Sequence, residues 1–277
     1  MCCFSTHVER VFDTRILARF TSPEEQLLVY EMALEARGDL AMILPIPVAL
    51  GTPDDAVVFK DLSGYPDFFG DLHRAFPEPR PERIAVTAAG PPVTKAELVV
   101  HRVGDFVASF VPTVSAFDRL DARFRLPGEV WPDAVRDHGF VVFQLAGVAD
   151  QHPQSWISRF IGRAPTPKPR RYHPMAFTFP SRDRSRLFYP TLHIHRGQVH
   201  TRAEFDHVLY AQLDPAEIKS RVAAFLHPRG NPAVWRRSIG PLGEFVDAAR
   251  GPDLVNPDQI GWCHPLSGVA MNVDLWL

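Results

Sequence analysis

Proline is the residue that most limits how this chain can fold. The 277 residues include 27 prolines, and they recur from Pro23 to Pro265. Proline lacks a backbone N–H and fixes φ, so it interrupts helices and the interior of sheets. A bundle of long helices is therefore not expected. The chain must be built from short elements that are joined by structured loops.

Apolar and β-branched residues between the prolines form runs of strand length. Strands are predicted at 14–20, 26–34, 40–48, 139–148 and 172–180, and short helices at 67–76, 115–124 and 215–226. This pattern predicts a β-rich α+β fold with mainly antiparallel sheet and a few short helices. We expect one domain over 1–277, in which the polar, basic-ended stretch 149–171 is a lid or linker.

Histidine is concentrated in the segment 187–213, which reads LFYPTLHIHRGQVHTRAEFDHVLYAQL and holds four of the chain's 12 histidines. Arg196-Gly197 suits the turn of a tight hairpin. In that register His193 faces His200, and His195 shares their face. Cross-strand Cβ atoms lie about 5 Å apart. Three imidazoles would then reach one metal ion, although a turn shifted by one residue would move His200 to the other face.

A face of three histidines is typical of zinc, iron or copper sites that keep one position open for chemistry. We therefore predict His193, His195 and His200 as ligands of a transition metal, with zinc ahead of copper and iron. Asp206 and His207 follow on the outgoing segment. They are predicted as a further ligand, or as groups that orient a ligand imidazole or act in catalysis. The alternative is that these histidines are ordinary polar surface.

Two adjacent cysteines, Cys2 and Cys3, open the chain. Removal of Met1 would place the thiol of Cys2 beside the α-amine, as in N-terminal-nucleophile hydrolases. Either thiol would alternatively complete the histidine site as a soft ligand, which favours zinc or Cu(I). Cysteine is present only 3 times, so no disulfide framework is expected. The plainest alternative is that both are small apolar residues after the initiator.

Charge and hydropathy limit the classes of partner. The formal net charge is −2 and no long basic block is present, so nucleic acid is not an expected partner. No apolar run has the length of a membrane span, and the first residues lack the apolar core of a signal peptide. We expect a cytoplasmic protein that acts on a small molecule or a peptide.

Two stretches resemble a widespread set of uncharacterised bacterial proteins. They are MCCFSTHVERVFDTRILARF with LAMILPIPV, and HPMAFTFP with LFYPTLHIHRGQVHTRAEFDHVLYAQ. The first 50 residues are also similar to a bacterial family that pairs an N-terminal cysteine with a strand ending in L-P-x-P. The resemblance spans most of the chain and implies no activity, so the functional hypotheses depend on the residues themselves.

Three functional hypotheses follow. The first is a metal-dependent enzyme, hydrolytic or redox, built on the histidine hairpin with the N-terminal cysteines nearby. The second is an amide hydrolase with Cys2 as its nucleophile. The third is a non-catalytic ligand-binding protein whose histidines line a polar pocket. The first is preferred because it needs only local geometry, whereas the second needs a distant base to reach Cys2.

Overall fold

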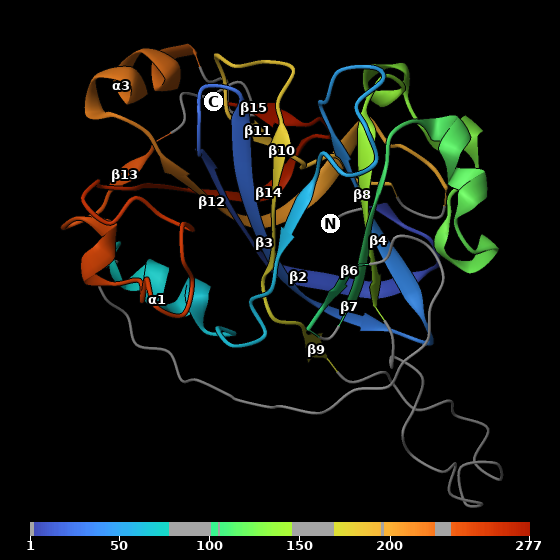
Figure 1. The fold of residues 1–277 in the computed structure, drawn as a ribbon, viewed down its shortest axis with the longest axis horizontal. Coiled ribbons are helices and arrows are strands. Elements are labelled where there is room, and N and C mark those ends of the chain that lie inside the picture. Colours follow the sequence, from blue (N-terminus) through green and yellow to red (C-terminus); the bar gives the residue numbers. More distant parts are fainter. Residues whose placement is uncertain (1–2, 78–100, 105, 146–168, 195–196, 225–233) are drawn as a thin grey trace, which may run out of the picture.

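The computed structural model describes residues 3–77, 101–104, 106–145, 169–194, 197–224 and 234–277. Two sheets dominate these residues (Figure 1), and all but one of the pairings between their described strands are antiparallel, which confirms the predicted β-rich class. Within the described part of the chain, no helix has the length and apolar character needed to cross a bilayer.

The larger sheet contains the longest strands. Its members are β2 (Val8–Phe20), β3 (Glu25–Ala36), β5 (Val58–Lys60), β9 (Arg170–Arg171), β10 (Met175–Pro180), β12 (Arg202–Gln212), β13 (Arg236–Arg237) and β14 (Trp262–Met271). Their order is β13-β14-β12-β2-β3-β10-β5, and β9 also pairs with β3. The exception to antiparallel pairing is β12 with β2, where His207 pairs with Thr14 and Gln212 with Arg19.

The smaller sheet is antiparallel. It contains β1 (Cys3–Phe4), β4 (Leu40–Ile46), β6 (His101–Val103), β7 (Phe106–Val111) and β8 (Gly139–Leu145), in the order β1-β4-β8-β7-β6. A separate pair joins β11 (Phe188–Tyr189) to β15 (Leu275–Trp276), which brings the start of the histidine-rich segment to the C-terminal end of the chain.

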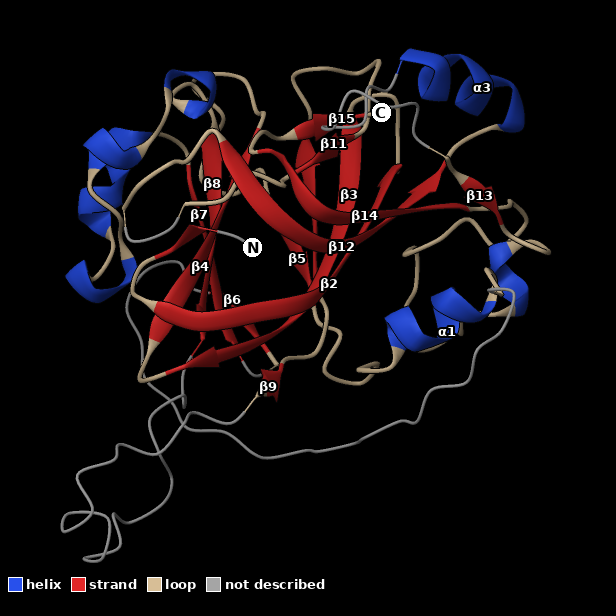
Figure 2. Ribbon diagram, turned by 180° about the vertical axis from the view of Figure 1, so that it is seen from behind, coloured by secondary structure: helices blue, strands red, loops and turns tan. Residues whose placement is uncertain are grey.

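Helices are short and lie outside the two sheets (Figure 2). In the described part of the chain, the α-helices are α1 (Phe68–Arg74) and α3 (Pro215–Ala224), and the 3₁₀ helices cover Val114–Arg119, Ala122–Phe124, Gly128–Val130, Asp133–Val135 and Leu242–Glu244. The helix predicted over 115–124 is thus replaced by two 3₁₀ turns. Asp121 separates them, because its carboxylate accepts the N–H of Arg123 and begins the second turn.

The main core lies between the two sheets. Phe177 from the larger sheet contacts Phe143 from the smaller one, with ring centroids 6.0 Å apart. A second core packs α1 against the opposite face of the larger sheet, where Leu17 and Val29 contact the helix side. Strand β3 is buried on both faces as a result. This explains why its sequence reads as an almost continuous apolar run rather than an alternating one.

Candidate functional site

The histidine-rich segment is held by the C-terminal end of the chain. The carboxylate of Asp274 accepts the N–H groups of Thr191 and Leu192 at 2.9 and 2.8 Å. The carboxamide oxygen of Asn272 accepts the N–H of His193 at 2.7 Å, and its nitrogen donates to the carbonyls of His193 and His200 at 2.8 and 2.9 Å. The side chain of Asn272 therefore bonds both ends of the predicted hairpin.

His193 is an interior residue. Its side chain is fully buried, and its ring lies 4.5 Å from Phe205 and 5.4 Å from His207, centroid to centroid. Burial lowers the pKa of His207 well below its ordinary value, so this imidazole is neutral at pH 7. The rings of His193 and His207 pack against each other. They lie at the face of β12 that is directed toward the core between the sheets.

His200 lies in a different environment, because its side chain is exposed to solvent whereas that of His193 is buried. Gly197 has a φ of 70°, as a turn at that point requires. His195 and Cys2, two further predicted ligands, lie outside the described residues. No group of three His, Cys, Asp or Glu side chains that could hold a metal ion is found among the residues described.

The preferred functional hypothesis, a metal-dependent enzyme with a three-histidine hairpin, is therefore wrong. Its physical error was to treat His193 and His200 as neighbours across an isolated hairpin. In the structure, a distant asparagine bonds the backbone of both, and the two side chains lie in opposite environments. The transition-metal cofactor that accompanied the hypothesis stays a prediction that no observation supports.

Cys3 does reach the histidine-rich segment. It pairs with Ile43 of β4 and forms a parallel bridge to Ile194. Its thiol donates a weak hydrogen bond to the carbonyl of Leu192 at 3.8 Å, and the residue is fully buried. A thiol without exposed surface is not placed to attack a substrate or to meet one. The structure thus gives Cys3 a packing role between the N-terminal strand and residues 192–194.

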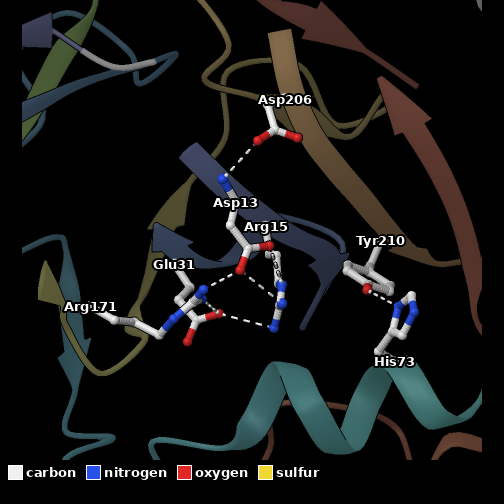
Figure 3. Close-up of polar contacts among 7 residues, drawn as sticks. All are labelled: Asp13, Arg15, Glu31, His73, Arg171, Asp206 and Tyr210. Carbon is white, nitrogen blue, oxygen red and sulfur yellow. Dashed lines mark hydrogen bonds and ion pairs between the residues drawn. The ribbon is translucent and has the colours of Figure 1, made fainter. Parts of the chain in front are cut away.

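Asp206 points away from His207, as neighbouring residues in a strand must. Its carboxylate accepts the backbone N–H of Asp13 at 3.0 Å, on the face of the larger sheet that also carries α1 (Figure 3). Asp13 lies at an irregularity in the pairing of β2 with β3, and its φ of 54° is unusual for a residue other than glycine. The bond from Asp206 helps to hold this turn of the backbone.

Asp13 belongs to a cluster of four charged residues, which we call the charged cluster: Asp13, Arg15, Glu31 and Arg171. Arg15 donates to Asp13 at 3.1 Å and to Glu31 at 3.4 Å. Arg171, from β9, donates to Glu31 at 3.1 Å and also pairs with Asp13. Each carboxylate is therefore shared by both guanidinium groups (Figure 3).

The two carboxylates of the charged cluster have opposite pKa shifts. Burial raises the pKa of Glu31 to about 7, and the attraction of Arg171 and Arg15 offsets only part of that effect. Burial also acts to raise the pKa of Asp13, but Arg15 and Arg171 outweigh it, and the pKa lies below its ordinary value. Such a divergence occurs in acid–base pairs and equally in structural ion-pair networks. The shared guanidiniums favour a structural network.

The sequence contains one sign of the charged cluster, which is a single acidic residue within a predicted strand. Glu31 is the one charged residue in the otherwise apolar or uncharged run 26–34. A carboxylate in a fully buried strand needs a partner of opposite charge. That requirement would have pointed to arginines on neighbouring strands. It would not have identified Arg171, which is 140 residues away in the sequence.

A second polar pair lies beside α1. The Nδ1 atom of His73 and the hydroxyl of Tyr210 are 2.9 Å apart, and burial raises the pKa of Tyr210 far above its ordinary value (Figure 3). The tyrosine is therefore a neutral phenol at pH 7. This pair connects α1 to β12, and the ring of Tyr210 also packs with Phe69 and Phe76 of the second core.

An open cleft lies beside the part of the histidine-rich segment that runs from Gly197 to His200. It has a volume of about 600 Å³ and separates the residues 129–136 from the loop 197–200. The residues that line it are Glu129, Val130, Trp131, Pro132, Asp133, Arg136, Gly197, Gln198, Val199 and His200. Among the predicted site residues that the structure describes, His200 is the one that lines this cleft. We call this feature the 129–200 cleft.

The walls of the 129–200 cleft combine apolar side chains with polar groups. Val130 and Val199 come from opposite walls, and Val199 is 37% exposed. Asp133 and Arg136 form an ion pair at 2.8 Å on the rim. Within the described residues, the carboxylate of Glu129 has no ion-pair or hydrogen-bond partner. The described residues that line the cleft therefore carry one net negative charge, which lies on Glu129.

Comparisons with known proteins give limited information. No family model matches the sequence, and no curated protein matches it. Solved structures with a related shape include P35 of a baculovirus, at 13% identity and a TM-score of 0.48 over 100% of this chain and 99% of that chain. A caspase-cleaved mutant of P35 matches at 11% identity and a TM-score of 0.43, over 95% and 98% of the two chains.

A third similar structure is the complex of P35 with caspase-8, at 10% identity and a TM-score of 0.41 over 95% of this chain and 94% of that one. Binding to caspase-8 is a property of P35. Every one of these TM-scores is below 0.5 and every identity is 13% or less. A likeness at this level transfers no activity and no partner to the present chain.

Proposed function

We propose that the chain is a non-catalytic protein-binding protein whose 129–200 cleft receives a basic side chain from an extended segment of a partner. The observation that carries this proposal is the carboxylate of Glu129 in a cleft that the apolar side chains of Val130 and Val199 also line. Lysine and arginine side chains have an apolar stem and a cationic head. The stem would lie between Val130 and Val199, and the head would meet Glu129.

The size and openness of the cleft favour a peptide segment over an enclosed small molecule. Small-molecule sites usually surround most of the ligand and are largely apolar. Here both walls carry polar side chains, including Gln198, His200 and the Asp133–Arg136 pair. Backbone and side-chain groups of a peptide would bond to these polar groups, while its basic residue supplies the charge complementarity.

The experiment is selection from a library of random heptapeptides displayed on phage, followed by Kd measurements on the enriched peptides by fluorescence polarisation. We expect lysine or arginine to be enriched at one position. Val199→Arg should weaken binding at least roughly tenfold, because it places a large cation in the cleft. Glu129→Gln should weaken it about fivefold, as expected for a partly exposed ion pair.

The matched controls are Val58→Arg, at an exposed valine of β5, and Glu204→Gln, at an exposed glutamate of β12. Neither residue lines the cleft, so neither variant should change Kd. Peptides that bind Val199→Arg and the wild type equally well would overturn the proposed site. Peptides that need the cleft but contain no basic residue would overturn the proposed charge complementarity alone.

A further inference from the structure

The two walls of the 129–200 cleft are held in different ways. The wall 129–136 is fixed by packing, because the ring of Trp131 lies 5.7 Å from that of Phe117 and 4.6 Å from that of Phe140, centroid to centroid. The wall 197–200 precedes the first residue of β12 and is therefore not held by the ladder of that strand. Its distance from the opposite wall must be set by contacts with other parts of the chain.

Asn272 joins the wall 197–200 to the interior. Its side chain is 5% exposed. The carboxamide nitrogen donates to the carbonyl of His200 at 2.9 Å and to that of His193 at 2.8 Å, and the oxygen accepts the N–H of His193 at 2.7 Å. The backbone N–H of Asn272 also donates to the carbonyl of Thr201 at 3.0 Å. A carboxamide has two donor hydrogens, and here each has a carbonyl partner.

The His193 end of this connection is fixed in the core. The side chain of His193 is fully buried, and its ring packs 4.5 Å from that of Phe205. Asp274 accepts the N–H groups of the two residues that precede His193, at 2.9 and 2.8 Å. Because several contacts hold this end, the carboxamide of Asn272 places the carbonyl of His200 at a set position relative to the core.

We propose that Asn272 is a positioning residue of the 129–200 cleft, whose carboxamide holds the wall 197–200 where it can receive the partner segment. This inference rests on the proposed function of the cleft. Asn272 is not one of the described residues that line the cleft, so it acts through the wall and not by contact with the ligand. If the segment binds only while the wall is held, the apparent Kd is the intrinsic Kd divided by the fraction of molecules in that state.

The test uses Asn272→Ala and a fluorescein-labelled, lysine-containing peptide selected on the wild type. The substitution deprives the carbonyls of His193 and His200 of their donor and frees the wall, so Kd should rise about tenfold. Hydrogen exchange resolved to single amides by NMR should be faster at residue 272, whose backbone bond to Thr201 does not involve the deleted side chain. A saturating concentration of the peptide should slow this exchange again, because binding favours the held wall.

Gln212→Ala is the matched control. The side chain of Gln212 is 4% exposed, and its carboxamide also makes three bonds to loop backbone. It accepts the N–H of Asn256 at 2.7 Å and donates to the carbonyls of Asn256 and Gln259 at 2.7 and 3.3 Å. None of these residues lines the cleft. This variant loses a comparable set of interior bonds and should keep the Kd of the wild type.

The wild type supplies a measurement that does not depend on the folding of a variant, since the saturating peptide should slow exchange at the amide of Asn272. The inference is overturned if that amide is unaffected, or if a peptide that needs Val199 binds Asn272→Ala as tightly as the wild type. An equal loss of affinity in Gln212→Ala also overturns it. Peptides that bind Val199→Arg and the wild type equally well overturn the proposed function of the cleft instead.

Discussion

Among single residues, the most informative groups are two buried carboxylates, whose pKa values are raised by burial. Asp274 is the second such group after Glu31. One of its oxygens accepts two backbone N–H groups, and the other is enclosed without a hydrogen-bond partner among the described residues. Burial raises the pKa of Asp274 to about 7, against the opposing effect of the two N–H donors.

This shift predicts how stability depends on pH. The folded pKa lies above the unfolded one, so the contribution of Asp274 is complete below about pH 4 and is lost as pH rises through 7. The loss has an upper bound of about 4 kcal/mol. In urea unfolding, the wild type should therefore lose stability relative to Asp274→Asn between pH 5 and pH 8, because asparagine does not ionise.

The shift of Glu31 has the same sign but is present in both proteins, so it cancels in this comparison. Asp118→Asn is the control, since Asp118 is an almost fully exposed partner of Arg125. Its stability difference from the wild type should be the same at both pH values. A difference between the wild type and Asp274→Asn that does not change with pH would contradict the assigned environment of Asp274.

The same scale shows where sequence reasoning failed at the site. A concentration of histidines predicts a ligand face only if nothing else satisfies the backbone between them. Here Asn272 does so, from 79 residues beyond His193. An asparagine near the end of a chain has no local pattern that predicts this contact. The position of Asp206 and His207 on opposite faces, in contrast, follows from strand alternation and was available from the sequence.

Among the elements, the apolar runs correctly predicted several of the longer strands. The predicted strand 26–34 lies within β3. The predicted strand 139–148 starts at the same residue as β8, Gly139. The apolar spacing at 115–124 sets Phe117, Leu120 and Phe124 three or four residues apart, and all three side chains are buried. It predicted the wrong backbone, because residues three apart share a face in a 3₁₀ helix as well. Element type is therefore less certain than burial when the run is short.

Strand β14 has an edge that is protected against pairing with another chain. β13 pairs only with Trp262 and Cys263, so no strand pairs along 265–271 on that side among the described residues. Pro265 removes one backbone donor from this edge, and Arg202 donates to the carbonyl of Val269 at 3.3 Å. Proline and covering charges are the usual means by which proteins protect an edge strand.

Removing both protections should expose the edge. The double variant Pro265→Val with Arg202→Ala should associate as its concentration rises, because Val269 and Met271 already present apolar side chains there. Light scattering coupled to size-exclusion chromatography measures this. Arg184→Ala, at an exposed arginine elsewhere, should leave the mass unchanged. A double variant that behaves as the wild type at every concentration would show that the edge has another protection.

At the scale of the whole molecule, the sequence predicted the class of fold and not its topology. Alternation and proline spacing are local properties, and they indicate strands and turns. The parallel pairing of β12 with β2 joins residues such as Asp13 and Asp206, which are 193 positions apart. No local pattern contains that information. The 129–200 cleft has the same origin, since its two walls come from separate parts of the chain.

The ligand that we propose for the 129–200 cleft is a basic segment of a partner protein. Hydrogen exchange measured with and without a lysine-containing peptide selected from the library tests it most directly. We predict slower exchange in 129–136 and 197–200 on binding, and no change in Glu129→Gln at a peptide concentration too low to occupy the weakened site. Slower exchange confined to other parts of the molecule would contradict the claim.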